Sequence, residues 1–182
     1  MALLTLDEAK RQLDIESTAH DVELQLYVDS LTAVIESYVG PVEDREVTEL
    51  AQAHGGVVCL LSTPVIAVTS LTPALSGGIA YTPDLLQVDG PSGVIRLLSG
   101  GYLCGGPWTV TYTAGRGAVP PTIKLAALIL LQHLWRTQNG AARGGGPTDD
   151  YSVTEPIPGF GYAVPNRVLQ LLEPYKRGPG IG

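Results

Sequence analysis

The spacing of apolar residues changes twice along the chain. Up to about residue 41 apolar positions recur every three or four residues, which predicts helices, whereas residues 42–113 tend towards a period of two, which predicts strands. Helical spacing returns from about residue 119. The pattern predicts an α+β protein, a helical bundle of about four helices with an inserted antiparallel β segment and an extended C-terminal arm.

The same transitions divide the chain into three parts. Residues 1–41 should form the N-terminal helices, 42–118 a β-rich insertion, and 119–182 a central buried helix, a flexible arm and a C-terminal helix. A chain of 182 residues can bury one core, so we expect a single domain with an insertion.

Two helices are predicted at the start of the chain. Thr5 and Glu8 have the spacing of a capping box, which predicts a helix over residues 6–13. A second helix should run from about 19 to 39 and end at Gly40, which is followed by a proline. Its apolar face comprises Leu24, Tyr27, Val28, Leu31, Val34, Ile35 and Tyr38.

The β segment should contain about six strands. Residues 89–93 have the composition of a hairpin turn between two of them. Residues 50–83 contain no Asp, Glu, Lys or Arg, so this stretch is covered either within the chain or by neighbouring chains, and the sequence leaves both open. The expected strands are Arg45 to Leu50, Gly56 to Leu61, Val65 to Leu71, Leu86 to Val88, Val94 to Leu98 and Trp108 to Thr113.

The C-terminal third should contain two further helices separated by an arm. A prolyl pair opens the first, which runs to about residue 138 and is apolar almost all round, as in a buried helix. Residues 141–163 have no sustained period and are rich in Gly and Pro, which predicts an extended or mobile arm, and its aromatic residues favour docking on another chain. Pro165 should begin the last helix and Pro174 limit its length.

Charge is sparse and unevenly distributed. Only 16% of residues are charged, and the net charge of −7 divides into −9 over residues 1–50, 0 over 51–123 and +2 over 124–182. No basic stripe exists, which argues against ordinary nucleic-acid binding. The asymmetry permits attraction between the front of one copy and the back of another, as in a head-to-tail ring, but a solvated acidic helix face explains it equally well.

No set of residues has the spacing of a catalytic or metal site. None of the three histidines has a ligand partner at the spacing of a zinc motif, and the glycine-rich pieces lack the phosphate-loop pattern. We therefore expect no enzyme, no cofactor and no metal, with Cys59 and Cys104 as buried or half-buried free thiols. The residues considered were His20, His54, His133 and the acidic pairs Glu43/Asp44 and Asp149/Asp150.

Targeting and membrane signals are not expected. The N-terminal sequence turns acidic within eight residues, unlike a signal peptide. The longest apolar stretch, residues 125–131, is much shorter than the ~20 residues of a membrane span. We expect a soluble protein made in a cytoplasm, without membrane contact.

Four further segments follow one another along the chain: Leu4 to Lys10, Ile35 to Gly40, Val119 to Leu128 and Val164 to Arg177. In this order they resemble the head-tail connector family (adaptor or head-completion proteins) of long-tailed bacteriophages. The family pairs an "LTLDEAK"-like first helix and an "AAIExYxG"-like second helix with a long apolar helix and a "P..v..LL.pYr" ending. The resemblance covers both ends and the central helix, about half of the chain.

The resemblance implies a structural role in the virion neck, with host cytoplasm as the place of assembly. Family members form a ring, usually a dodecamer, beneath the portal protein, and their far side accepts a stopper or tail-completion protein. Partners would then be the portal, that tail-side protein and other copies of the chain, while DNA passes through the lumen without specific binding. An acidic wall suits such a conduit because it repels phosphates.

On this interpretation the arm and the last helix contact other subunits or the portal, and β-segment loops face the tail. Alternatives are a tail-completion, stopper or minor capsid protein and, more remotely, a binding module or an undetected hydrolase outside phage biology. The candidate interface residues are Arg136, Arg143, Tyr151, Phe160, Tyr162, Arg167 and Tyr175.

Overall fold

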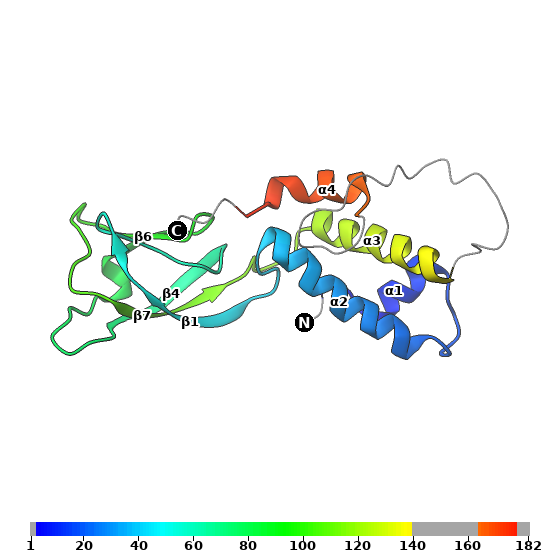
Figure 1. Ribbon diagram of the computed structural model, residues 1–182, viewed down its shortest axis with the longest axis horizontal. Helices are drawn as coiled ribbons and strands as arrows, with labels where there is room; N and C mark the ends of the chain where they lie inside the picture. Colours follow the sequence, from blue (N-terminus) through cyan, green and yellow to red (C-terminus); the bar gives the residue numbers. More distant parts are fainter. Residues whose placement is uncertain (1–2, 140–163, 178–182) are drawn as a thin grey trace. The chain divides into compact units, whose positions relative to one another are not determined.

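The computed structural model describes residues 3–139 and 164–177 (Figure 1). The described residues divide into two compact units: a helical unit from residues 3–39, 119–139 and 164–176, and a β unit from residues 40–118 with residue 177. Helices and antiparallel sheets are both present, which confirms the α+β class.

In the helical unit, α3 is the element against which the others pack. It contacts α1, α2 and α4, and its residues Ile123, Leu130 and Leu131 are fully buried. Leu125 on the same helix is 46% exposed, so the prediction of a helix buried all round is wrong on that side. The elements are α1 (Leu6–Leu13), α2 (Asp21–Val39), α3 (Pro121–Asn139), α4 (Asn166–Leu172) and the 3-10 turn η2 (Glu173–Tyr175).

The ends of α1 follow the local sequence. The predicted capping box is confirmed, since Thr5 and Glu8 each accept a hydrogen bond from the other's backbone amide. Asp14 ends the helix in the left-handed conformation, with φ of 54°.

Two antiparallel sheets form the β unit. One has the strand order β1-β7-β4 and the other β2-β3-β6-β5. Strand β4 carries irregularities where it pairs with β7, between Val65 and Ala67 and between Val68 and Ser70. The elements are β1 (Arg45–Ala51), β2 (Ala53–His54), β3 (Val57–Cys59), β4 (Val65–Pro73), the 3-10 turn η1 (Pro83–Leu85), β5 (Leu86–Asp89), β6 (Val94–Leu97) and β7 (Trp108–Ala114).

Strand β7 shows how the sequence builds this core. Its alternate residues are buried and the threonines between them are half-buried, as expected for a strand with one face on a core. The buried residues of the β unit form one cluster: Ala51, Val58, Leu60, Val65, Leu71, Leu86, Ile95, Leu103, Trp108, Val110, Tyr112 and Ala114.

The predicted hairpin at residues 89–93 is confirmed. The Gly93 amide donates to the Asp89 carbonyl at 2.8 Å, and Gly93 has a φ of +71° that favours glycine. The strand expected over residues 56–61 is shorter, because Gly55 and Gly56, both at positive φ, form a turn from β2 into β3.

Candidate assembly surfaces

Three of the seven candidate interface residues lie within the described chain. Arg136 is exposed in the last turn of α3, Arg167 is exposed near the start of α4, and Tyr175 is half-buried in η2. Arg143, Tyr151, Phe160 and Tyr162 lie outside the described residues, as does the predicted arm over 141–163. Their role in an interface stays a prediction.

The C-terminal turn η2 is fastened to the end of α2. The Tyr38 hydroxyl donates to Glu173 Oε2 at 2.5 Å, and Lys176 Nζ lies 3.6 Å from Glu173 Oε1 and 5.4 Å from the centre of the Tyr38 ring. Burial, with a further contribution from Glu173, raises the pKa of Tyr38, while the hydrogen bond from Tyr38 lowers the pKa of Glu173. Glu173 and Lys176, which belong to the last family-like segment, therefore hold that segment against α2 within the helical unit.

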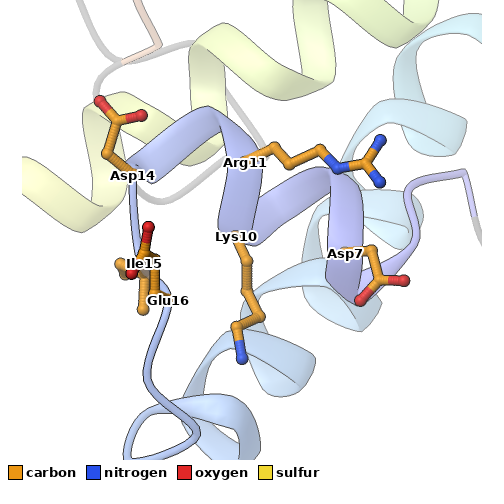
Figure 2. A pocket seen from close by; sticks show the side chains of 6 residues that line it. All are labelled: Asp7, Lys10, Arg11, Asp14, Ile15 and Glu16. Atoms are coloured by element: carbon orange, nitrogen blue, oxygen red, sulfur yellow. The ribbon is translucent and has the colours of Figure 1, made fainter.

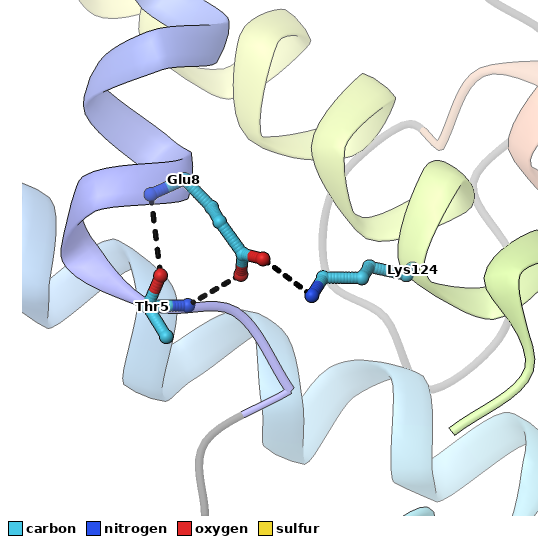
Figure 3. A network of polar contacts seen from close by, with 3 residues as sticks. All are labelled: Thr5, Glu8 and Lys124. Carbon is cyan, nitrogen blue, oxygen red and sulfur yellow. Dashed lines mark hydrogen bonds and ion pairs between the residues drawn. The ribbon is translucent and has the colours of Figure 1, made fainter. Parts of the chain in front are cut away.

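A second polar network joins α1 to α3 (Figure 3). Glu8 accepts from the Thr5 amide at 3.0 Å through one oxygen and from Lys124 Nζ at 2.5 Å through the other. The Lys124 hydrogen bond is the main reason that the pKa of Glu8 is lowered, and the Thr5 amide adds to it. One carboxylate therefore caps α1 and fixes it to α3.

Replacing this carboxylate should weaken the helical unit. We expect Glu8→Ala to lower the free energy of unfolding by about 1–2 kcal/mol near neutral pH, because a cap and a partly exposed ion pair are both lost. The measurement is urea unfolding followed by circular dichroism, with Glu16→Ala, an exposed acid beyond the helix, as the control. An equal effect of the two substitutions would contradict the role given to Glu8.

The Glu8 contribution should also depend on pH. The folded pKa lies below the ordinary value of 4.5, so the stabilisation is fully present above that value and is lost as the pH falls through the folded pKa. The difference between Glu8→Ala and the unsubstituted protein should therefore shrink in acid.

An open groove runs along the polar face of α1 (Figure 2). Its lining is Asp7, Lys10, Arg11, Asp14, Ile15 and Glu16, which includes no Ser, Thr, Cys or His. The Nζ atom of Lys10, one of the lining residues, lies 2.7 Å from Asp21 Oδ1 at the start of α2. The Lys10–Asp21 ion pair therefore joins α1 to the start of α2.

Two glycine-rich loops, residues 74–82 and 98–107, lie together in the β unit and are called the tip below. The Tyr81 hydroxyl accepts from the Cys104 amide at 3.2 Å and donates to the Cys104 carbonyl at 3.1 Å. Cys104 is exposed, so its expected burial is wrong, while Cys59 is half-buried as expected. Hydrogen bonds to the backbone thus hold the loops in one arrangement.

Trp108 supports the tip from the core. It is fully buried, and its indole Nε1 donates to the Ile79 carbonyl at 2.7 Å. This bond connects β7 with the first tip loop. The first tip loop is therefore held in place by a residue of the β-unit core.

The tip exposes large apolar side chains and contains no Asp, Glu, Lys or Arg. Tyr102, for example, is 73% exposed. Exposed apolar side chains that gather into a contiguous patch mark interaction sites, so the tip is a candidate docking surface. From the sequence we noted only that the glycine-rich pieces lack a phosphate-loop pattern, although the uncharged stretch over 50–83 was a usable signal for this surface. The exposed apolar residues of the tip are Leu75, Ile79, Leu98 and Tyr102.

The histidines are dispersed over different elements. His20 is exposed and contacts the Trp135 ring edge-on at 5.4 Å, His54 is exposed on β2, and burial lowers the pKa of His133. Within residues 3–139 and 164–177 no group of three or more His, Cys, Asp or Glu residues could hold a metal ion. No helix in the described part of the chain is long and apolar enough to cross a membrane.

Of the two acidic pairs considered from sequence, one is described. Asp44 Oδ1 accepts a hydrogen bond from the Gly117 amide at 2.8 Å, which ties the start of β1 to the segment after β7. Asp149 and Asp150 lie outside the described residues. The Asp44 carboxylate thus has a structural partner.

The polar contacts described above join elements of the fold, and the tip exposes apolar, uncharged residues. Such a surface is typical of proteins that dock on other chains. The model of the head completion protein family matches residues 2–178. The chain therefore belongs to the head completion protein family, structural virion proteins of bacteriophages, which confirms the resemblance seen in the sequence.

Chains in solved structures of gene transfer agent particles have the same fold. A chain in the neck of an empty gene transfer agent (GTA) particle, computed with C6 symmetry, has a TM-score of 0.63 at 20% identity, covering 99% of this chain and 92% of that one. A chain in the neck of a native GTA particle, computed with C12 symmetry, has a TM-score of 0.60 at 22% identity, covering 97% and 90%. No curated protein sequence matches the chain.

Proposed function

We propose that the protein is a head-tail connector: a ring in the virion neck that binds the portal, encloses the DNA exit path and offers a docking surface to a stopper or tail protein. The observation that carries this proposal is the family match over residues 2–178. The shared fold with chains from necks computed with six-fold and twelve-fold symmetry supports the ring, which we take to be a dodecamer.

The charge distribution supports the same role. Residues 1–50 carry a net charge of −9 and the chain as a whole −7, so a ring of copies repels the phosphates of passing DNA. DNA then moves through the lumen without being gripped. The role is structural and requires no catalytic residue.

The tip is our candidate for the tail-side docking surface. A surface without charged residues loses no ion hydration when a partner covers it, so it suits a partner face that is itself apolar and uncharged. We assign portal binding to the candidate residues of the C-terminal third, including Arg167 and Tyr175. This division assigns different parts of the chain to the two neighbours.

Co-purification tests the proposal. In cells infected with a phage that makes no tails, the protein should sediment with DNA-filled heads, and it should be missing from heads that lack portal. Recovery with free tails would contradict the connector role and favour a tail-completion protein, the second candidate.

A further inference from the structure

The two loops of the tip continue the pairing of β4 with β7. Strand β4 ends opposite the start of β7. Directly beyond these strand ends, the Ala74 amide donates to the Pro107 carbonyl at 2.9 Å. Further along the same loops, the Ile79 amide donates to the Gly105 carbonyl at 3.3 Å. The loops are therefore joined through their backbones at two places, and one of these is at an exposed apolar residue of the tip.

Tyr81 joins the same loops through its side chain. Its amide donates to the Leu71 carbonyl of β4 at 3.2 Å, and its half-buried ring packs against the β-unit core, 6.1 Å from the centre of the Trp108 ring. The hydroxyl of this anchored ring bonds to both the amide and the carbonyl of Cys104 on the other loop. One side chain therefore fixes the backbone of the second loop relative to the sheet.

The loops pack so closely that Gly105 has no room for a side chain. A Cβ at Gly105 would lie 2.9 Å from Ile79 Cγ1 and 3.0 Å from the Ile79 nitrogen, and Gly105 has a φ of +88°. Gly100 lies on the same loop with a φ of +76°, but no neighbouring atom lies within 4 Å of the position of its Cβ. Gly105 is thus required for space as well as for conformation, and Ile79 occupies that space.

We infer that Tyr81 and Gly105 are positioning residues, which hold the apolar side chains of the tip in place before any partner is bound. The inference rests on the proposed docking function of the tip and names the residues on which it depends. Loops that become ordered only on docking lose conformational entropy in every copy of the ring, whereas a surface that is already ordered does not. The tip therefore docks as a preformed surface.

Removing one hydroxyl tests the role of Tyr81. Tyr81→Phe keeps the ring and loses both bonds to Cys104, so hydrogen exchange of the Ile79 amide, which does not contact the hydroxyl, should accelerate about tenfold. DNA-filled heads that carry this variant should join purified tails about tenfold more slowly, because the tip of each copy must be ordered on docking.

The matched control is Tyr112→Phe in the same β unit. The Tyr112 hydroxyl also has two partners, since it accepts from the Ser62 amide and donates to Glu49, each at 3.1 Å. Neither partner belongs to the tip loops. This variant also loses two hydrogen bonds from the β unit, but its heads should join tails at the unsubstituted rate. A purely structural role of Tyr81 would give the two variants the same joining rate.

A pair of glycine substitutions tests the spacing of the loops. Gly105→Ala and Gly100→Ala both force alanine into the left-handed conformation, but only Gly105→Ala displaces Ile79. Joining should therefore slow about tenfold with Gly105→Ala and stay unchanged with Gly100→Ala. Tyr81→Phe, which removes a single oxygen atom, decides the matter if Gly105→Ala does not fold.

Normal joining by Tyr81→Phe heads, or equal slowing by Tyr81→Phe and Tyr112→Phe, would overturn the inference. The proposed docking function survives either result as long as Ile79→Asp, which places a carboxylate in the docking surface itself, still prevents joining. If Ile79→Asp heads join tails normally, the tip is not the docking surface, and the assignment of the tip and this inference both fail.

Discussion

Ile79→Asp at the tip should yield DNA-filled heads that do not acquire tails. A docked partner would bury the new carboxylate without a counterion, which costs about 3–5 kcal/mol per contact, and every copy of the ring carries the substitution. The yield of tailed particles should therefore fall by about 100-fold or more, as an affinity loss of that size implies. Electron microscopy and plaque counts measure the outcome.

The matched control is Ile66→Asp in β4. Both isoleucines are 49% exposed in the β unit, but Ile66 lies at the start of β4, away from the tip loops. This variant should attach tails normally. If both variants lose tails equally, or neither does, the tip is not the tail-side docking surface.

Gly40→Ala should strongly destabilise the β unit. Gly40 has a φ of +81°, and a Cβ there would lie 2.0 Å from the Thr63 carbonyl oxygen. The left-handed conformation costs a non-glycine residue about 1–2 kcal/mol. Forcing the carbonyl away adds about 1–3 kcal/mol. Urea unfolding, followed by the fluorescence of the buried Trp108 in a Trp135→Phe background, measures the loss.

Gly77→Ala separates the two contributions. Gly77 has a φ of +86° and no atom within 4 Å of the position of a Cβ, so only the conformational cost of about 1–2 kcal/mol applies. If Gly40→Ala lowers the free energy of unfolding no more than Gly77→Ala does, the close approach to the Thr63 carbonyl contributes nothing to the loss.

The elements predicted best are those with local causes. The capping box of Thr5 and Glu8 and the prolyl start of α3 depend on residues within one turn, and the predicted helix bounds agree with the structure to about two residues. Strand β2 was missed because two residues carry no periodicity. It forms because Gly55 and Gly56 turn the chain back onto β3.

The tip could not be predicted because its causes are distant in sequence. Tyr81 meets Cys104 and Trp108 meets Ile79 only after the sheets have formed. For the uncharged stretch the sequence left two explanations open. The structure leaves several of its large apolar residues exposed, which favours coverage by neighbouring chains. In the tip these residues are Leu75 and Ile79.

The exposure of residues on the helices was also only partly predictable from the sequence. The sequence named Arg136 and Arg167 as candidate interface residues, and the structure exposes both. Leu125 on α3 was interpreted as part of the core, because helical spacing alone does not tell which side of an apolar helix has a partner within its own chain. The exposure of Val22 and Leu26 on α2 was not predicted, for the same reason.

The most direct test of the central claim is a cryo-electron microscopy reconstruction of the particle neck, without imposed symmetry. We predict one closed ring of this chain between portal and tail, around the DNA path, with twelve-fold symmetry like that used for the similar native GTA neck. A neck whose density contains no copy of the chain, or a chain found only within the tail, would contradict the account.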